Sequence, residues 1–165
     1  MPEFQLGSIS TGTLRPEDLL PAFIESLTAT GGKIPEDLTC GTHLEYTNLP
    51  SYSSVGVIDA DDAFWQSDDA RDDVDALIDA LEARCPPFVY FGSLPGDGAD
   101  FGFWVDTEPL GDALQDGPAD EPPTEGWDWD LGEYTLANHG VIVQVFGHGD
   151  AIAMDMERNV LWSLV

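Results

Sequence analysis

The chain has 165 residues, of which 32 are Asp or Glu and 5 are Lys or Arg, so its formal net charge at pH 7 is −27. A surface of this kind repels nucleic acid, anionic lipid and acidic substrates, and it attracts cations and basic protein grooves. Hydrophobic residues make up 42% of the chain and aromatic residues 10%, which is enough apolar material for a folded core. The length suits one domain over residues 1–165.

The acidic residues are clustered along the chain. Residues 59–82 hold ten acids and one arginine, and residues 106–133 hold ten acids and no base. A compact chain of this length is roughly 40 Å across, and 27 charges correspond to about 46 Å of duplex DNA. The clustering favours a dedicated negative face over charge spread evenly in all directions.

The cysteines and the hydropathy pattern bear on location. Cys40 and Cys85 stand in neither metal-binding nor redox spacing, so we expect two reduced, buried thiols in a cytoplasmic protein. The first 20 residues lack the basic and apolar regions of a signal peptide. No run of about 18 apolar residues occurs, so the sequence predicts no membrane span.

Two amphipathic helices are predicted in the first half. The first covers residues 16–29, with Pro16 at the first helical position and apolar residues at helical spacing. The second begins after Ser67, a favourable N-cap, and ends before Pro86 and Pro87. We expect its solvent face to carry Asp72, Asp73, Asp75, Asp79 and Glu82.

In the second half of the chain, apolar and polar residues alternate with the period of two that is typical of strands. Residues 88–93 and 100–106 flank a turn-rich loop and predict a hairpin, and residues 107–130 form an acidic Pro/Gly-rich insert. Residues 132–137, 141–146, 151–156 and 160–164 predict an antiparallel meander. Residues 33–58 are ambiguous apart from a short strand at 54–58. The expected fold is α+β, with two or three helices packed on an antiparallel β-meander sheet in a single domain.

No catalytic or cofactor motif is evident. The loop at residues 96–100, with two aspartates, fits a hairpin turn better than a calcium site, because the EF-hand spacing is absent. The turn at residues 147–150 is interpreted in the same way. The three histidines are too scattered for a metal motif, and Cys85 follows a helix C-terminus, which disfavours a thiolate nucleophile. We therefore expect a protein that is not an enzyme, with no catalytic residue, no metal and no cofactor. Trp127 and Trp129 fit either an exposed anchor for a partner or a buried strand.

Two segments resemble known groups of proteins. The stretch from Tyr90 to Trp104, which reads YFGSLPGDGADFGFW, and the end LWSLV are similar to small uncharacterised acidic proteins carried by phages and plasmids. This resemblance implies an origin in a mobile element. Residues 149–155, GDAIAMD, resemble a strand of the SMI1/KNR4 (SUKH) immunity domains. The acidity resembles, in kind, the DNA-mimic proteins of phages and plasmids, which place carboxylates where a partner expects phosphates.

These observations favour an acidic nucleic-acid mimic that inhibits a host defence or DNA-processing complex by occupying its basic groove. The expected partner is a basic nucleic-acid-binding protein or complex, with no direct binding of nucleic acid or membrane. Two alternatives remain open: a SUKH-like immunity or scaffold protein that binds a basic toxin, and a housekeeping protein of a salt-adapted organism. The expected partner-binding residues are Asp68, Asp69, Asp72, Asp73, Asp75, Asp79, Glu82, Asp112, Asp116, Asp120 and Glu121.

Overall fold

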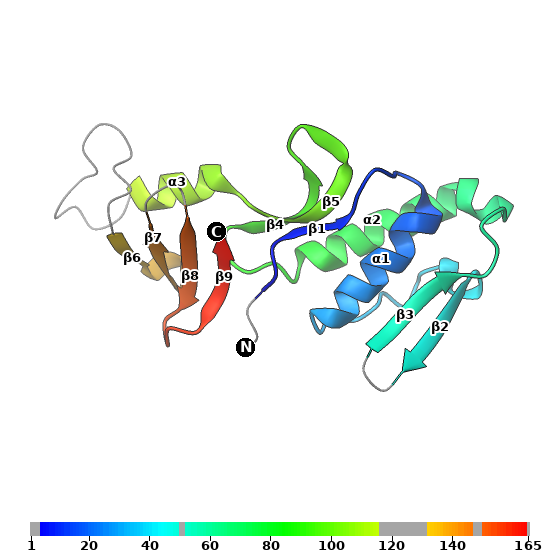
Figure 1. Cartoon of the computed structure of the whole chain (residues 1–165), viewed down its shortest axis with the longest axis horizontal. Coiled ribbons are helices and arrows are strands. Elements are labelled where there is room, and N and C mark those ends of the chain that lie inside the picture. Colours follow the sequence, from blue (N-terminus) through cyan, green and yellow to red (C-terminus); the bar gives the residue numbers. More distant parts are fainter. Residues whose placement is uncertain (1–3, 50–51, 116–131, 147–149, 165) are drawn as a thin grey trace. The chain divides into compact units, whose positions relative to one another are not determined.

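A computed structural model describes residues 4–49, 52–115, 132–146 and 150–164. Over these residues it contains three α-helices and three antiparallel sheets, so the predicted α+β class is confirmed. The chain divides into two compact units (Figure 1). We call Gly7–Cys85 with Phe91–Phe103 the helical unit, and Met1–Leu6, Pro86–Tyr90 and Trp104–Val165 the meander unit. The assignment of residues 1–165 to one domain stays a prediction.

Helix α1, Pro16–Ala29, has the predicted bounds and supplies much of the core of the helical unit. Its apolar face is buried, and Phe23 is completely excluded from solvent. The Phe23 ring packs edge-on against Phe91, with ring centroids 5.1 Å apart, and also against Phe101. These contacts place α1 on the aromatic face of a three-stranded sheet.

That sheet consists of β1, Gly7–Ser10, β4, Val89–Leu94, and β5, Asp97–Val105, in the order β1-β5-β4. Strands β4 and β5 confirm the predicted hairpin, although β5 begins at Asp97, inside the loop predicted from the sequence. Gly96 lies between them with φ +94°, a conformation that favours glycine.

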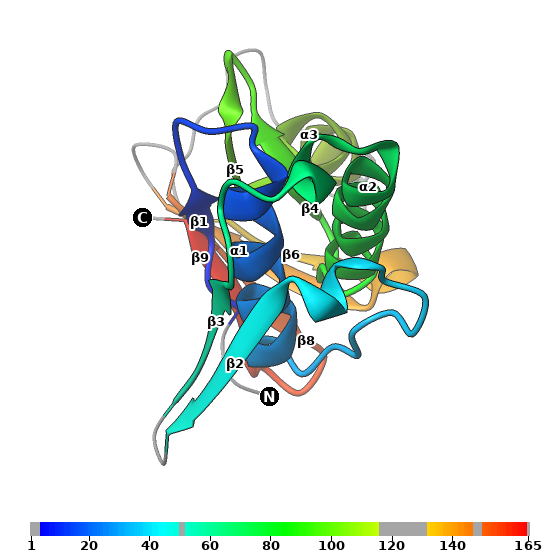
Figure 2. The ribbon, with the colours of Figure 1, turned by 90° about the vertical axis from the view of Figure 1, so that its right-hand side faces the viewer.

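Helix α2, Asp68–Glu82, packs against α1, and Figure 2 shows the two helices side by side. Ser67 is the N-cap, as predicted, because its hydroxyl accepts a hydrogen bond of 3.1 Å from the Ala70 amide. Val74, Leu77 and Leu81 are buried, so the amphipathic pattern identified the correct apolar face.

The ambiguous segment at residues 33–58 contains a hairpin. Strand β2, Leu44–Leu49, pairs in antiparallel fashion with β3, Tyr52–Val57, and β3 packs against α1. Two short 3-10 helices flank this hairpin: η1, Cys40–Thr42, and η2, Ala63–Gln66. The strand predicted at residues 54–58 therefore begins two residues earlier and has an unpredicted partner.

The meander unit contains β6, Gly132–Leu136, β7, Val141–Val145, β8, Ala151–Asp155, and β9, Val160–Leu164, in sequential order. The predicted antiparallel meander is confirmed, with the 3-10 helix η3, Ala137–His139, between β6 and β7. Trp162 is completely buried here, and its indole N–H donates to the Pro87 carbonyl at 2.9 Å.

The start of the predicted insert is a helix. Residues Thr107–Gln115 form α3, whose Leu110 and Leu114 are buried four residues apart. Pro109 lies in the first turn, where proline is tolerated because the N–H groups there have no acceptor within the helix. The remainder of the predicted insert, residues 116–130, lies outside the residues that the structure describes. Among the described helices, none is long and apolar enough to cross a membrane.

Candidate functional site

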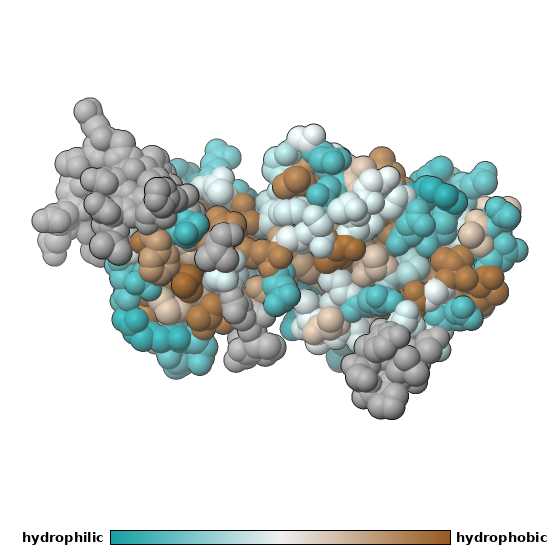
Figure 3. Space-filling view, in the orientation of Figure 1, coloured by the Kyte–Doolittle hydropathy of each residue, from teal (hydrophilic) through white to brown (hydrophobic). Residues whose placement is uncertain are grey.

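Five exposed carboxylates form one face of helix α2, which we call the acidic face: Asp68, Asp72, Asp75, Asp79 and Glu82. Their spacing of four, three, four and three residues keeps them within a sector of about 80° around the helix axis. From the first to the last, the face is about 21 Å long at 1.5 Å per residue. Hydrophilic surface covers the end of the helical unit where α2 begins, with apolar surface among it (Figure 3).

The charge density of the acidic face is close to that of one DNA strand. Five charges over about 21 Å compare with about six phosphates over the same length of a strand, at 3.4 Å per phosphate. Arg71 forms an ion pair of 2.7 Å with Asp68, and both side chains are largely exposed. Within the described part of the chain, Asp72, Asp75 and Asp79 have no ion pair with a basic residue. The negative charge of this face is therefore largely uncompensated.

Asp73 does not belong to the acidic face, and its prediction as an exposed contact was wrong. Only 4% of its surface is exposed. Its carboxylate accepts hydrogen bonds from the amide and hydroxyl of Thr39, both at 3.0 Å, and from the amide of Cys40 at 2.7 Å. Three donors satisfy the charge of the buried carboxylate. Asp73 fastens η1 to α2, so it cannot contact a partner.

Glu82 is exposed but has a structural contact as well. Its Oε2 accepts a hydrogen bond from the Phe91 amide on β4 and lies 3.8 Å from the Cys85 sulfur. Burial, followed by the charge of Glu82, raises the pKa of the Cys85 thiol to about 12. Burial and the Asp73 carboxylate do the same for Cys40, which is completely buried. At these pKa values both thiols keep their proton near neutral pH. The prediction of a buried thiol is confirmed for Cys40 and wrong for Cys85, which is half-buried just after the end of α2.

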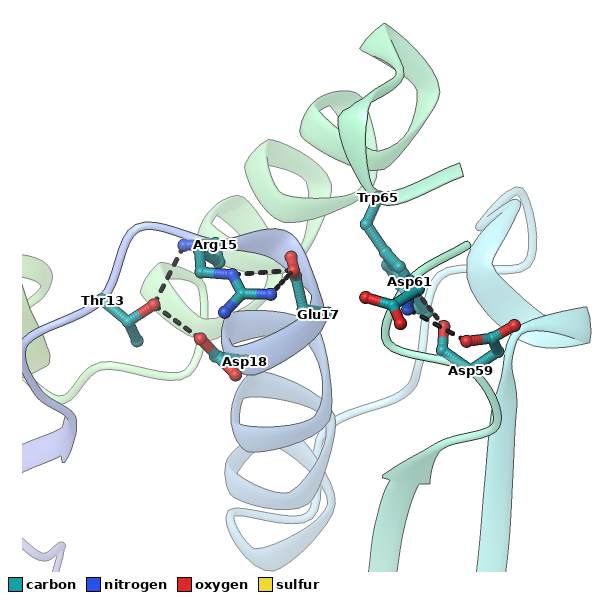
Figure 4. Close-up of polar contacts among 7 residues, drawn as sticks. All are labelled: Thr13, Arg15, Glu17, Asp18, Asp59, Asp61 and Trp65. Carbon is teal, nitrogen blue, oxygen red and sulfur yellow. Dashed lines mark hydrogen bonds and ion pairs between the residues drawn. The ribbon is translucent and has the colours of Figure 1, made fainter. Parts of the chain in front are cut away.

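A second acidic segment lies between β3 and α2. Asp59 and Asp61 are exposed, and the Trp65 indole N–H donates to the Asp59 carbonyl at 2.7 Å. Figure 4 shows this loop opposite the start of α1, where Arg15 pairs with Glu17. The hydrogen bond and charge of Glu17 raise the pKa of Arg15, and Asp61 adds to this effect. Arg15 thus compensates part of the acidic charge here.

Asp62 and His43 form a contact that the sequence did not predict. The imidazole Nδ1 lies 3.1 Å from the Asp62 carboxylate, and the ring stacks on Phe64 with centroids 4.1 Å apart. Nineteen residues separate His43 from Asp62, so no local pattern connects them. The only signal available was the pair of aromatic residues after an acidic loop, Phe64 and Trp65.

The remaining predicted partner-binding residues divide into two groups. Asp69 is exposed at the margin of the acidic face, and Asp112 is exposed on α3 in the meander unit. Asp116, Asp120 and Glu121 lie outside the described residues, as do Trp127, Trp129 and the Gly147–Gly149 turn. Among the predicted contacts that fall in the described residues, those that the structure brings together lie on α2.

The candidate cation loop at residues 96–100 is the turn and start of the β4–β5 hairpin, which confirms the hairpin interpretation. Asp97 Oδ1 accepts a hydrogen bond from the Ala99 amide at 3.1 Å, so this carboxylate serves the turn. Among the described residues, no group of three or more His, Cys, Asp or Glu side chains is placed to hold a metal ion.

Comparisons with known proteins gave no match: no protein-family model, no curated protein and no solved structure is significantly similar to this chain. The resemblances to phage and plasmid proteins and to SUKH domains therefore stay predictions.

Proposed function

We propose that the chain is an acidic mimic of nucleic acid that inhibits a basic nucleic-acid-binding protein by occupying its groove. The contacts come from the acidic face of α2, extended by Asp69. Inhibition is competitive, because carboxylates of the mimic fill positions that phosphates otherwise take. The proposed setting is a mobile element acting against a host defence or DNA-processing complex.

The observation that carries this proposal is the arrangement of the acidic face. Five carboxylates lie in one row on a rigid helix, at nearly the density of phosphates along a DNA strand. Like charges three and four residues apart destabilise an isolated helix. A helix that keeps this arrangement, with one arginine on it, gives up part of its own stability, and this cost supports a role in binding a cationic surface.

The mimicry requires a rigid support, and the packing of α2 supplies one. Leu77 and Leu81 are completely buried on the opposite side of the helix, and Asp73 holds the adjoining loop. Carboxylates on short aspartate side chains lose little conformational freedom on binding, compared with long side chains. The row is therefore largely in place before a partner arrives, which favours affinity.

The experiment compares two variants with the same change of net charge. The face variant carries Asp68→Asn, Asp72→Asn, Asp75→Asn and Asp79→Asn. The matched control carries Glu36→Gln, Asp37→Asn, Glu108→Gln and Glu157→Gln, at exposed positions outside α2. The wild-type chain captures its partner from lysate at low salt, and titration then measures the affinity of each variant for the recovered protein.

We expect the face variant to lose more than tenfold in affinity and the control to lose little. Duplex DNA should displace the wild-type chain from the partner, and affinity should fall steeply with salt. Equal losses in both variants would show that net charge matters and not its placement. A single tight partner that DNA does not displace would favour the immunity-protein alternative, and a chain that folds only in molar salt would favour the salt-adapted alternative.

A further inference from the structure

The hairpin of β2 and β3 is a two-stranded sheet, so each strand has one edge that pairs with no other strand in the part of the chain that the structure describes. Strand β3 contacts α1, and the hairpin projects from the helices in two views (Figures 1 and 2). The pairing continues without a shift in register from Leu44 opposite Val57 to Leu49 opposite Tyr52. The outer edge of β2 is therefore a regular strand edge, without a bulge that would hinder further pairing.

The hydrogen bonds of the hairpin determine which amides of β2 point outward. The Ile58 amide donates to the His43 carbonyl at 3.0 Å, so residues 43 and 58 form a hydrogen-bonded pair. Because bonded and non-bonded pairs alternate along an antiparallel ladder, the amides of residues 44, 46 and 48 point away from β3. The Val55 amide, directly opposite residue 46, agrees with this alternation, since it donates to the Glu25 side chain and not to β2.

The other three edges of the two sheets built around α1 are occupied or irregular. Glu25 and Glu82 accept hydrogen bonds from outward amides of β3 and β4. The register of β1 shifts between Ser8 and Ser10. Occupied amides and bulges both hinder the addition of a further strand. Within the described residues, the outward amide of Tyr46 on β2 has no side-chain acceptor of this kind.

The side chains of β2 differ between the two faces of the hairpin. Tyr46 lies on the face of the buried Leu44, yet 50% of its surface is exposed. Glu45 points to the opposite face and is exposed, and the two strands contain neither Lys nor Arg. Asp59 and Asp61, in the loop after β3, are exposed as well. A strand added beside β2 would therefore meet an aromatic surface on one face and negative charge on the other.

We propose that the outer edge of β2 binds an extended segment of a basic partner protein by antiparallel strand addition. The segment carries Lys or Arg at alternate positions, with apolar residues between them. Its apolar residues lie opposite Leu44, Tyr46 and Asn48, where the backbone bonds form, and its cations lie on the face of Glu45.

Charge complementarity selects this occupant over a second copy of the chain. Each copy has a net charge of −27, so two copies repel one another, whereas a cationic segment is attracted. The contact uses β2 and no residue of α2, so it goes beyond the proposed mimicry of nucleic acid and does not depend on it.

Two synthetic peptides of equal charge test the edge in the full chain. The first has the sequence KVKVKVK with blocked ends, and the second carries N-methyl groups on its three valines, which removes the donors that would face β2. The chain variants are Tyr46→Pro, which removes one outward donor at a position where an edge strand tolerates proline, and Tyr46→Val, which keeps that donor. Calorimetry at about 0.15 M salt measures affinity, and amide exchange followed by NMR locates the peptide.

We expect the first peptide at saturation to slow exchange of the Tyr46 and Asn48 amides about tenfold, because both gain a backbone acceptor. The Glu45 amide, already bonded within the hairpin, should change little. N-methylation should weaken binding more than about tenfold, since it removes several backbone bonds. Tyr46→Pro should bind the first peptide about fivefold more weakly than Tyr46→Val.

Equal affinity of the two peptides would show only a general attraction to an acidic chain and would overturn the proposal. Slowed exchange confined to amides outside β2 would do the same. Dimers of the chain alone that protect the Tyr46 amide would assign the edge to a second copy and overturn the basic occupant. If Tyr46→Pro does not fold, the two peptides with the wild-type chain decide. Because no variant changes α2, failure here leaves the proposed mimicry to its own test.

Discussion

Replacing Asp72, Asp75 and Asp79 together with asparagine should make the folded chain more stable. Four neighbouring like-charge pairs run along the acidic face, from Asp68 to Asp72, on to Asp75, on to Asp79 and finally to Glu82. All four pairs include at least one of the three replaced residues. The variant keeps Asp68, whose charge at the helix N-terminus is favourable, and Glu82, which binds the Phe91 amide.

The magnitude follows from the spacing. A like-charge pair three or four residues apart on a helix is unfavourable by about 0.2–0.5 kcal/mol, so four pairs amount to about 1–2 kcal/mol. One favourable contribution is lost, because Arg71 lies four residues before Asp75, and this offsets about 0.3 kcal/mol. Asparagine and aspartate have similar helix propensities, so the backbone term is small. The expected net gain is about 1 kcal/mol, or about 2–4 °C in Tm for a chain of this size.

Urea unfolding monitored by circular dichroism at low and high salt measures this gain. The gain should disappear near 1 M salt, where the Debye length is only about 3 Å. A control variant with Glu36→Gln, Asp37→Asn and Glu157→Gln removes the same number of charges from exposed positions outside α2. A face variant that is less stable than the wild type at low salt, or a control that gains as much, would refute the argument from helix spacing.

Three further predictions concern the described residues. Asp73→Ala should lower the free energy of unfolding by about 2–4 kcal/mol in a urea titration, because it leaves buried amide donors without an acceptor; an exposed Asp73 would give almost no loss. Cys40 and Cys85, whose thiol pKa values are each raised to about 12, should resist alkylation at neutral pH in the native chain and react after unfolding; rapid native labelling would contradict the burial of Cys40 or the raised pKa of the half-buried Cys85. The pKa of Asp155 is lowered by bonds from the side chain and amide of Asn159, so its stabilisation should be present above about pH 4 and be lost as pH falls through the lower folded value; Asp155→Asn should flatten that part of a curve of Tm against pH.

The elements with strong local signals were predictable from the sequence. Pro16 and the glycine pair after Ala29 bound α1, and Ser67 with Pro86 bound α2, because caps and prolines act within a few residues. The strands of the meander agree with prediction to within a residue at each end, because each turn between them has its own sequence signal.

The features that the sequence did not predict depend on contacts between residues that are far apart along the chain. Asp73 differs from its exposed neighbours only through Thr39 and Cys40, which lie 34 and 33 residues away. Strand β2 has little alternation of its own and forms by pairing with β3. Tertiary contacts of this kind override the local pattern, so the acidic face was predicted with one wrong member.

The hairpin β2–β3 has a consequence for how the chain behaves among its own copies. The Val55 amide of β3 donates to the Glu25 carboxylate of α1 at 2.7 Å. A strand whose free amide is already bonded to a side chain offers a poor template for intermolecular pairing. Glu25 thus occupies one outward donor of β3. Its removal should free that donor for pairing between copies, and the strong charge repulsion between copies would then be the main barrier to such pairing.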